Sequence, residues 1–321
     1  MTYRLPLGER VLAGDPRAIA RAISIIEDDR PSAAALVGQL FPHTGGAYLV
    51  GVTGPPGAGK STLVDRMVTD ARAAGETIGV IAVDPTSPFT GGSVLGDRLR
   101  MQTHAGDTGV FIRSMATRGH LGGLARTTSD VAVVLDAAGK SIVIVETVGV
   151  GQDEVDIVRT ADVSVVVLVP GTGDDVQALK AGIMEIADIY VVNKADREGA
   201  ERMVTSIESN LALQEFGDGQ WRPPIVRSQA TTGTGVPELW SAIRSFRQHT
   251  QATRQARMAA RQEYRLRELL ARRFLEHVES RVLAPGEFDA LVARIAAREL
   301  DPYSAARDVM ARAVGARLES A

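Results

Sequence analysis

The sequence predicts an α/β fold in which helices cover both faces of a doubly wound, mainly parallel sheet. One observation is that apolar strand candidates alternate with helical stretches along most of the chain. Another is that segments such as 141–145 are apolar at nearly every position, as expected of strands covered on both sides. The strand candidates are 47–53, 77–83, 110–113, 141–145, 163–169, 188–192 and 225–227.

A helical extension is predicted before the first strand candidate. Segments 16–26 and 32–40 have the spacing of short amphipathic helices, and Pro31 separates them. We therefore assign residues 1–46 to an N-terminal helical extension and residues 47–248 to the sheet domain.

The last part of the chain carries no strand pattern and is predicted to be a helical arm over 249–321. A long helix is expected over 251–283, and the Pro285-Gly286 pair makes a turn. Helical spacing returns over 288–296, and Asp301-Pro302 has the pattern of a cap and first turn that open a last helix.

The composition is typical of a soluble globular protein and excludes several classes of function. Of 321 residues, 45% are hydrophobic and 23% charged. The net charge of -3 gives no sign of a positively charged surface for nucleic acid or an anionic membrane. The absence of cysteine excludes disulfides and thiolate metal sites. The first thirty residues lack a signal-peptide pattern, and segment 163–169 is too short to cross a bilayer, so we expect a cytoplasmic protein.

The segment after the first strand candidate has the pattern G-x-x-x-x-G-K-[ST] of a phosphate-binding loop, or P-loop. It follows an apolar run and precedes a helical pattern, which is the context that the motif requires. Its glycines allow backbone N–H groups to approach phosphate oxygens, and the lysine ammonium is expected to lie against the β- and γ-phosphates. The predicted phosphate-binding residues of this P-loop NTPase fold are Gly54, Pro55, Pro56, Gly57, Ala58, Gly59, Lys60, Ser61 and Thr62.

Oxygen ligands for Mg²⁺ are predicted beside this loop. The Ser61 hydroxyl is one, and the carboxylates of Asp84, Asp97 and Glu146 lie at or after strand ends, although a turn or helix cap is the alternative for Asp97. Glu146 is the strongest candidate because the stretch that follows it ends in Gly149, in the manner of the D-x-x-G motif of GTPases. The predicted metal ligands are Ser61, Asp84, Asp97 and Glu146, and the predicted catalytic residues are Lys60, Asp84, Asp97, Glu146 and Gly149.

The stretch 193–196 has the pattern N-K-x-D and follows a strand candidate. Guanine presents two neighbouring N–H donors that one carboxylate accepts as a pair, whereas adenine does not, so Asp196 is expected to select guanine. Asn193 is expected to bind the other edge of the base and to brace the loop, and the alkyl stem of Lys194 to cover the ring. Further backbone N–H groups could come from 228–230, where Gln229 departs from the usual Ser-Ala pair. The predicted base-binding residues are Asn193, Lys194, Asp196, Gln229 and Ala230.

With these motifs in place, the chain resembles the MeaB/ArgK-type GTPases associated with methylmalonyl-CoA mutase. The resemblance is carried by the stretches VGVTGPPGAGKSTL, VDPTSPFTGGSVLGDRLRM, MATRGHLGGLA, ETVGVGQDE and PGTGDDVQALKAGIMEIADIYVVNKAD. It implies a Mg²⁺-dependent, GTP-driven chaperone of an adenosylcobalamin-dependent mutase, which gates cofactor delivery and protects or reactivates the enzyme.

The resemblance also implies moving parts and an oligomeric state. Segments 84–100 and 146–158 correspond to nucleotide-sensing loops, and 170–180 to a mobile loop that faces the mutase. In that loop a polar run could equally be an ordinary solvated loop. The C-terminal helices imply a homodimer, with an arm folded back on its own sheet domain as the alternative. The candidates for relaying the nucleotide state are Asp174, Asp175, Gln177 and Lys180.

Slow intrinsic hydrolysis is expected, because Val150 occupies the position where many fast GTPases carry a water-orienting glutamine. Three other functions are considered. One is an ATP- or GTP-dependent kinase of a transport-system protein, against which Asp196 argues for ATP and the lack of a separate phosphoacceptor site argues in general. Another is a metallochaperone GTPase, against which the lack of cysteine argues. A module that holds nucleotide without turnover remains the third.

Overall fold

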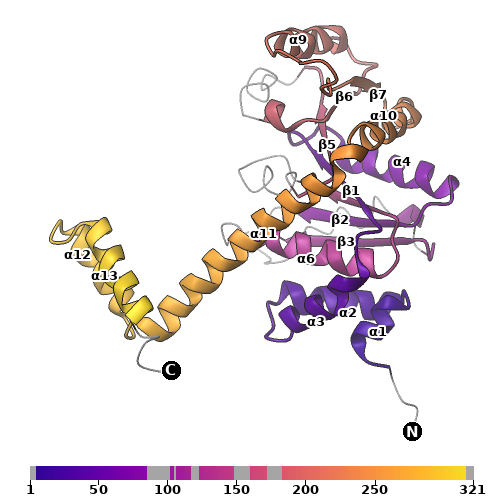
Figure 1. Ribbon diagram of the computed structural model, residues 1–321. Coiled ribbons are helices and arrows are strands. Elements are labelled where there is room, and N and C mark those ends of the chain that lie inside the picture. The colour runs from indigo at the N-terminus through magenta and orange to yellow at the C-terminus, as the bar shows by residue number, and fades with distance from the viewer. Residues whose placement is uncertain are drawn as a thin grey trace. The chain divides into compact units, whose positions relative to one another are not determined.

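The structure is a computed structural model that describes residues 5–84, 102–104, 106–116, 123–147, 160–171 and 183–315 (Figure 1). The chain divides into two compact units, Met1–Ala252 and Thr253–Ala321. The domain boundaries after residues 46 and 248 stay predictions.

Seven strands form one sheet in the first unit, and every described pair of neighbouring strands is parallel. The order across the sheet is β3-β2-β4-β1-β5-β6-β7, so the chain winds outward in both directions from a central β1. This arrangement confirms the predicted doubly wound, parallel sheet. The strands are β1 Tyr48–Thr53, β2 Ile78–Asp84, β3 Val110–Ala116, β4 Ile142–Glu146, β5 Val163–Leu168, β6 Ile189–Asn193 and β7 Ile225–Ser228.

Helices cover both faces of this sheet. On one face, α4 (Lys60–Ala73) and α10 (Val236–His249) share one hydrophobic core with side chains from most of the strands. On the other face, α6 (Gly123–Ala137) packs on the β2–β4 side and α9 (Ala200–Ala212) packs on β5 and β6. Described 3₁₀ turns lie at Phe41–His43, Gln102–His104, Ile183–Ile186 and Gln251–Thr253.

Three N-terminal helices complete the α6 layer, as the indigo ribbon of Figure 1 shows. They are α1 (Leu7–Leu12), α2 (Pro16–Glu27) and α3 (Ala33–Leu40). The Asp15 carboxylate accepts the backbone N–H groups of Arg17 and Ala18, and Pro16 occupies the first turn, so α2 begins where the sequence predicts. The six-residue α1 is not among the predicted helices, because it is too short to display a periodic pattern.

The second unit consists of helices in the part that the structure describes. The helix α11 spans Arg254–His277 and is followed by a π-helical turn at Val278–Val282. Next come α12 (Glu287–Ala296) and α13 (Pro302–Gly315), and an ion pair of 2.8 Å joins Arg312 to Glu287. The Ser304 N–H donates to Asp301, which confirms the expected start of the last helix. No described helix has both the length and the apolar content that crossing a membrane requires.

Candidate nucleotide-binding site

The P-loop connects the end of β1 to the start of α4. Its backbone takes left-handed conformations at Gly54 (φ 145°) and Gly59 (φ 82°) that favour glycine. A Cβ atom on Gly54 would lie 2.0 Å from the carbonyl oxygen of Val167, and one on Gly59 would lie 2.6 Å from Nδ2 of Asn193. Both glycines are therefore required by close packing against β5 and β6.

The Lys60 ammonium lies inside this loop. Its Nζ donates to the carbonyl oxygens of Gly54 at 2.6 Å and Pro55 at 3.1 Å, and the residue is only 6% exposed. A buried ammonium needs oxygen partners, and the loop carbonyls supply them. The positive charge is thus held at the start of α4, where the helix dipole also favours an anion.

Two predicted metal ligands meet beside the loop. Ser61 Oγ donates to Glu146 Oε1 at 2.6 Å, and Glu146 is 6% exposed at the end of β4. Strand pairing brings them together, because Glu146 is in register with Val52 of β1, two residues before the P-loop begins. A hydroxyl and a carboxylate are hard oxygen donors of the kind that Mg²⁺ prefers, so this pair fits the metal.

The remaining predicted metal ligands are not described at side-chain level. Asp84 ends β2, which lies next to β4 with Ala82 in register with Glu146, so the Asp84 backbone lies at the same edge of the sheet. The Asp84 side chain, Asp97 and Gly149 lie outside the described residues, as does most of segments 84–100, 146–158 and 170–180. Among the residues that the structure does describe, no three His, Cys, Asp or Glu side chains form a metal-binding group.

Asn193 joins three segments at the opposite end of the P-loop. Its Nδ2 donates to the carbonyl of Ala58 at 2.8 Å, and its Oδ1 accepts from the N–H of Ala230 at 3.1 Å and the hydroxyl of Ser228 at 3.2 Å. The residue is 1% exposed. Its amide therefore ties the phosphate loop to both loops that follow β6 and β7.

The neighbouring Lys194 is also bound to the P-loop. Its backbone adopts a positive φ of 54°, which is uncommon outside glycine, and its Nζ donates to the carbonyl of Gly57 at 2.8 Å. Two residues further along, Asp196 is exposed. The predicted phosphate-binding and base-binding segments are thus contiguous in space.

The backbone N–H groups of Gln229 and Ala230 have hydrogen-bond acceptors within the chain. The Gln229 N–H donates to the carbonyl of Thr234, and the Ala230 N–H donates to Asn193. Because both donors already have acceptors, neither is available to a ligand in this structure. A guanine contact through these two groups stays a prediction.

Sequence reasoning missed two hydroxyl contacts that support the site. Ser228 Oγ binds Asn193, and Thr147 Oγ1 donates to Thr53 Oγ1 at 2.9 Å where β4 and β1 end. Their positions could have indicated these contacts. Each hydroxyl residue lies at the carboxyl end of a strand whose neighbour leads into the P-loop or the N-K-x-D stretch, and side chains at these ends meet.

Comparison with known proteins decides the family. The family model described as methylmalonyl-CoA mutase-associated GTPase MeaB matches residues 19–283. The chain belongs to the MeaB family. It is therefore a GTPase, and membership of this family implies that the protein binds GTP.

Individual relatives of this MeaB-family GTPase agree with that assignment. It is 50% identical over 317 residues to a candidate GTPase of Pyrococcus abyssi, with 97% of each chain covered. It is 36% identical over 287 residues to GTPase ArgK of Escherichia coli, covering 87% of this chain and 86% of ArgK. Among solved structures, a LAO/AO transport system kinase matches with a TM-score of 0.70 and 26% identity, covering 95% of each chain.

Proposed function

We propose that this MeaB-family protein is a Mg²⁺-dependent GTPase that acts as a chaperone of an adenosylcobalamin-dependent acyl-CoA mutase, methylmalonyl-CoA mutase. It gates cofactor loading and protects or reactivates the enzyme. The observation that carries the proposal is the match of residues 19–283 to a family described by its association with that mutase. The match includes all the residues assigned to the nucleotide site.

The nucleotide site binds and orients GTP through groups of this chain. The P-loop backbone and the Lys60 ammonium hold the β- and γ-phosphates, since the ammonium already lies among the loop carbonyls. Asp196 accepts the paired N–H donors of guanine. The Lys194 stem covers the ring, and the Asn193 amide holds the surrounding loops in place. Gly149 contributes an N–H toward the γ-phosphate.

Mg²⁺ would be held by Ser61 and Glu146, with Asp84 and Asp97 as further ligands. The support is the 2.6 Å contact that brings the Ser61 and Glu146 oxygens to one point beside the P-loop. When bound, the metal neutralises charge on the phosphate oxygens. The residues of this chain hold the hydroxyl and the carboxylates in the positions where that charge develops.

Homodimerisation through the second unit is part of the proposal. The helices α11 and α12 have no buried residue within the described structure, although they carry large apolar side chains. A stripe of this kind is stabilised by packing against another surface, for which a second copy of the chain is the simplest source. The exposed apolar residues are Leu266, Leu270, Phe274, Leu275, Phe288 and Val292.

The proposed function is tested by measuring phosphate release from GTP with and without purified methylmalonyl-CoA mutase. We expect slow turnover alone and a stimulation of about tenfold or more with the mutase, because a partner completes a site that lacks a water-orienting glutamine. The Lys60→Ala variant is the control and should release little phosphate in either condition.

A second measurement distinguishes a chaperone from a GTPase that binds the mutase without assisting it. Adenosylcobalamin transfer to the apo-mutase should depend on GTP and on this protein, as followed by cobalamin absorbance. The proposal would be contradicted if GTP hydrolysis were maximal without the mutase and cofactor loading were independent of the nucleotide.

A further inference from the structure

The sheet of the first unit ends at β7, far along the strand order from the P-loop. In the described part of the chain, β7 pairs on one side only, with β6. The N–H of Tyr190 donates to the carbonyl of Pro224, and that of Ala195 to the carbonyl of Ser228. Because alternate residues of a strand direct their backbone groups to the same side, Pro224, Val226 and Ser228 face β6.

The backbone groups of Ile225 and Arg227 consequently point away from the sheet. The Arg227 carbonyl lies against Gly235, where an added Cβ would approach it to 2.1 Å, so the following loop closes this end of the edge. The Ile225 N–H, the Ile225 carbonyl and the Arg227 N–H make no hydrogen bond with any residue that the structure describes. An edge with such groups is a template for one more extended strand.

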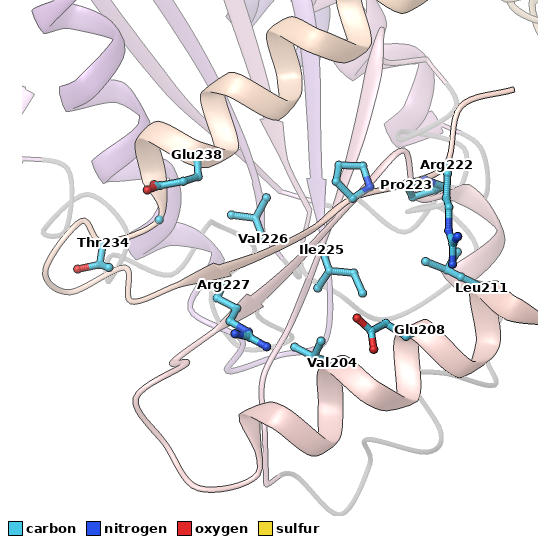
Figure 2. Close-up of a pocket in the computed structure, with 12 residues that line it drawn as sticks. Val204, Glu208, Leu211, Arg222, Pro223, Ile225, Val226, Arg227, Thr234 and Glu238 are labelled. Atoms are coloured by element: carbon cyan, nitrogen blue, oxygen red, sulfur yellow. The ribbon is translucent and has the colours of Figure 1, made fainter. Parts of the chain in front are cut away.

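An open groove of about 660 Å³ runs along this edge. Figure 2 shows Val204, Glu208 and Leu211 reaching toward it from α9, with Ile225 on the β7 side. Ile225 packs with the α9 core, whereas Val226 belongs to the core under α10. An added strand would therefore place alternate side chains toward the apolar groups of α9 and toward the start of α10.

The charges of the groove favour a basic occupant. Arg227 is neutralised by Glu201, whose carboxylate lies 2.7 Å from its guanidinium, and Arg222 lies over the Phe216 ring. Glu208 and Glu238 line the groove, are exposed, and form no ion pair within the described structure. Arg222 keeps its positive charge over the Phe216 ring, but Glu208 and Glu238 outweigh it, and the resulting net negative charge attracts lysine or arginine.

We propose that the β7 edge is a docking surface for an extended, basic segment of a partner protein. The segment adds an eighth strand beside β7, with apolar side chains toward Val204 and Leu211 and basic side chains toward Glu208 and Glu238. Hydrogen bonds to the Ile225 and Arg227 backbone hold it in register. The groove shares no lining residue with the predicted nucleotide site, and the proposal does not depend on which mutase is served.

The probe is a fluorescein-labelled peptide of seven alternating lysine and leucine residues, titrated with the full-length protein and followed by fluorescence anisotropy. We expect saturable binding of one peptide per chain at physiological salt. A second peptide has N-methyl groups on every backbone amide, which removes the donors on both edges of the strand. It should bind about tenfold more weakly or worse, because strand pairing requires those donors.

Matched charge reversals locate the surface. Each single variant, Glu208→Lys and Glu238→Lys, should weaken binding of the first peptide by about threefold. The Glu9→Lys variant changes an exposed carboxylate on α1 in the same way and should bind the peptide like the unmodified protein. All three substitutions are at exposed helix positions, and circular dichroism tests whether each variant is folded.

Three results of comparing these peptides and variants would overturn the proposal. They are equal binding of the N-methylated peptide, equal weakening by Glu9→Lys, and tighter binding of an alternating glutamate and leucine peptide. The first would exclude strand addition, the second would reduce the effect to overall charge, and the third would exclude a basic occupant. Absence of saturable binding up to millimolar protein would also reject it.

Discussion

Asn193 is the residue on which the geometry of the nucleotide site most depends. Its amide makes three buried hydrogen bonds, to the P-loop at Ala58, to the end of β7 at Ser228 and to the following loop at Ala230. The sequence predicted that Asn193 binds one edge of guanine and braces the loop. The hydrogen bonds of the bracing role are present in the structure. A buried polar group that loses its partner costs more than the bond itself contributes.

Replacing Asn193 by alanine should therefore lower the free energy of unfolding by about 2–4 kcal/mol, since the Ala58 carbonyl and the Ala230 N–H lose their partner in a buried site. Urea unfolding measures this loss, and titration with a fluorescent GDP analogue should show weaker binding. The matched control is Asn210→Ala, where a single bond to the Ser206 carbonyl is lost on α9. Equal stability of the two variants would contradict the bracing role.

At the scale of elements, a charged pair connects α4 to the turn before β3. Arg72 donates to both carboxylate oxygens of Asp107, at 2.8 and 3.0 Å, and the N–H of Gly109 also donates to this carboxylate. The hydrogen bond from Arg72 is the main cause that lowers the pKa of Asp107 below its usual value. The pair thus connects the helix after the P-loop to a strand at the sheet edge.

This lowered pKa predicts a pH dependence of stability. Because the folded-state pKa of Asp107 lies below the unfolded value of about 3.9, the pair stabilises the fold above that pH. The contribution is lost as the pH falls through the folded-state pKa. The Asp107→Asn variant should therefore be less stable than the unmodified protein at pH 7, with a difference that shrinks below pH 4.

Chemical unfolding at several pH values tests this dependence. The exposed Asp218, changed to asparagine, serves as the control and should show a small difference that does not vary with pH. A constant stability gap between Asp107→Asn and the unmodified protein from pH 7 to pH 3 would show that the charge of Asp107 is not responsible.

The elements themselves were largely predictable from the sequence. Buried parallel strands are apolar on both faces, so all seven strand candidates were found, and the observed ends differ from the predicted ones by at most a few residues. The long helix predicted over 251–283 ends as an α-helix at His277, because the pattern of apolar residues does not distinguish an α-helical turn from the π-helical turn at Val278–Val282.

The sequence predicts which residues form the site better than it predicts the hydrogen bonds between them. Motif spacing identified the P-loop and N-K-x-D stretches, and strand order explains why they meet. The hydrogen bonds that occupy the Gln229 and Ala230 N–H groups depend on the path of the post-β7 loop, which no local pattern encodes. The β7 edge groove likewise arises from strand order, which places this strand last in the sheet.

At the scale of the whole molecule, the exposed apolar side chains of the second unit predict that the protein forms a dimer. Leu270 is 60% exposed and Phe274 is 42% exposed on α11. Changing both to arginine should weaken self-association, because two charges would have to be desolvated in an apolar interface. Light scattering across a dilution series measures the effect, and we expect a shift from dimer to monomer.

The control for this shift is Leu213→Arg, which changes a leucine that is 84% exposed in the first unit. It should leave the mass unchanged. A chain ending at Gln248 should be monomeric. A dimer that persists after removal of the whole arm would contradict its role, and so would loss of the dimer in Leu213→Arg alone.

The central claim is that one carboxylate, that of Asp196, makes this MeaB-family protein select guanine. Isothermal titration calorimetry with GDP and with ADP, in the presence of Mg²⁺, tests it most directly for the unmodified protein and for Asp196→Ala. We expect GDP to bind about 10⁴-fold more tightly than ADP, and the Asp196→Ala variant to lose most of that preference. Equal or tighter binding of ADP by the unmodified protein, or a GDP preference that survives in Asp196→Ala, would contradict the claim.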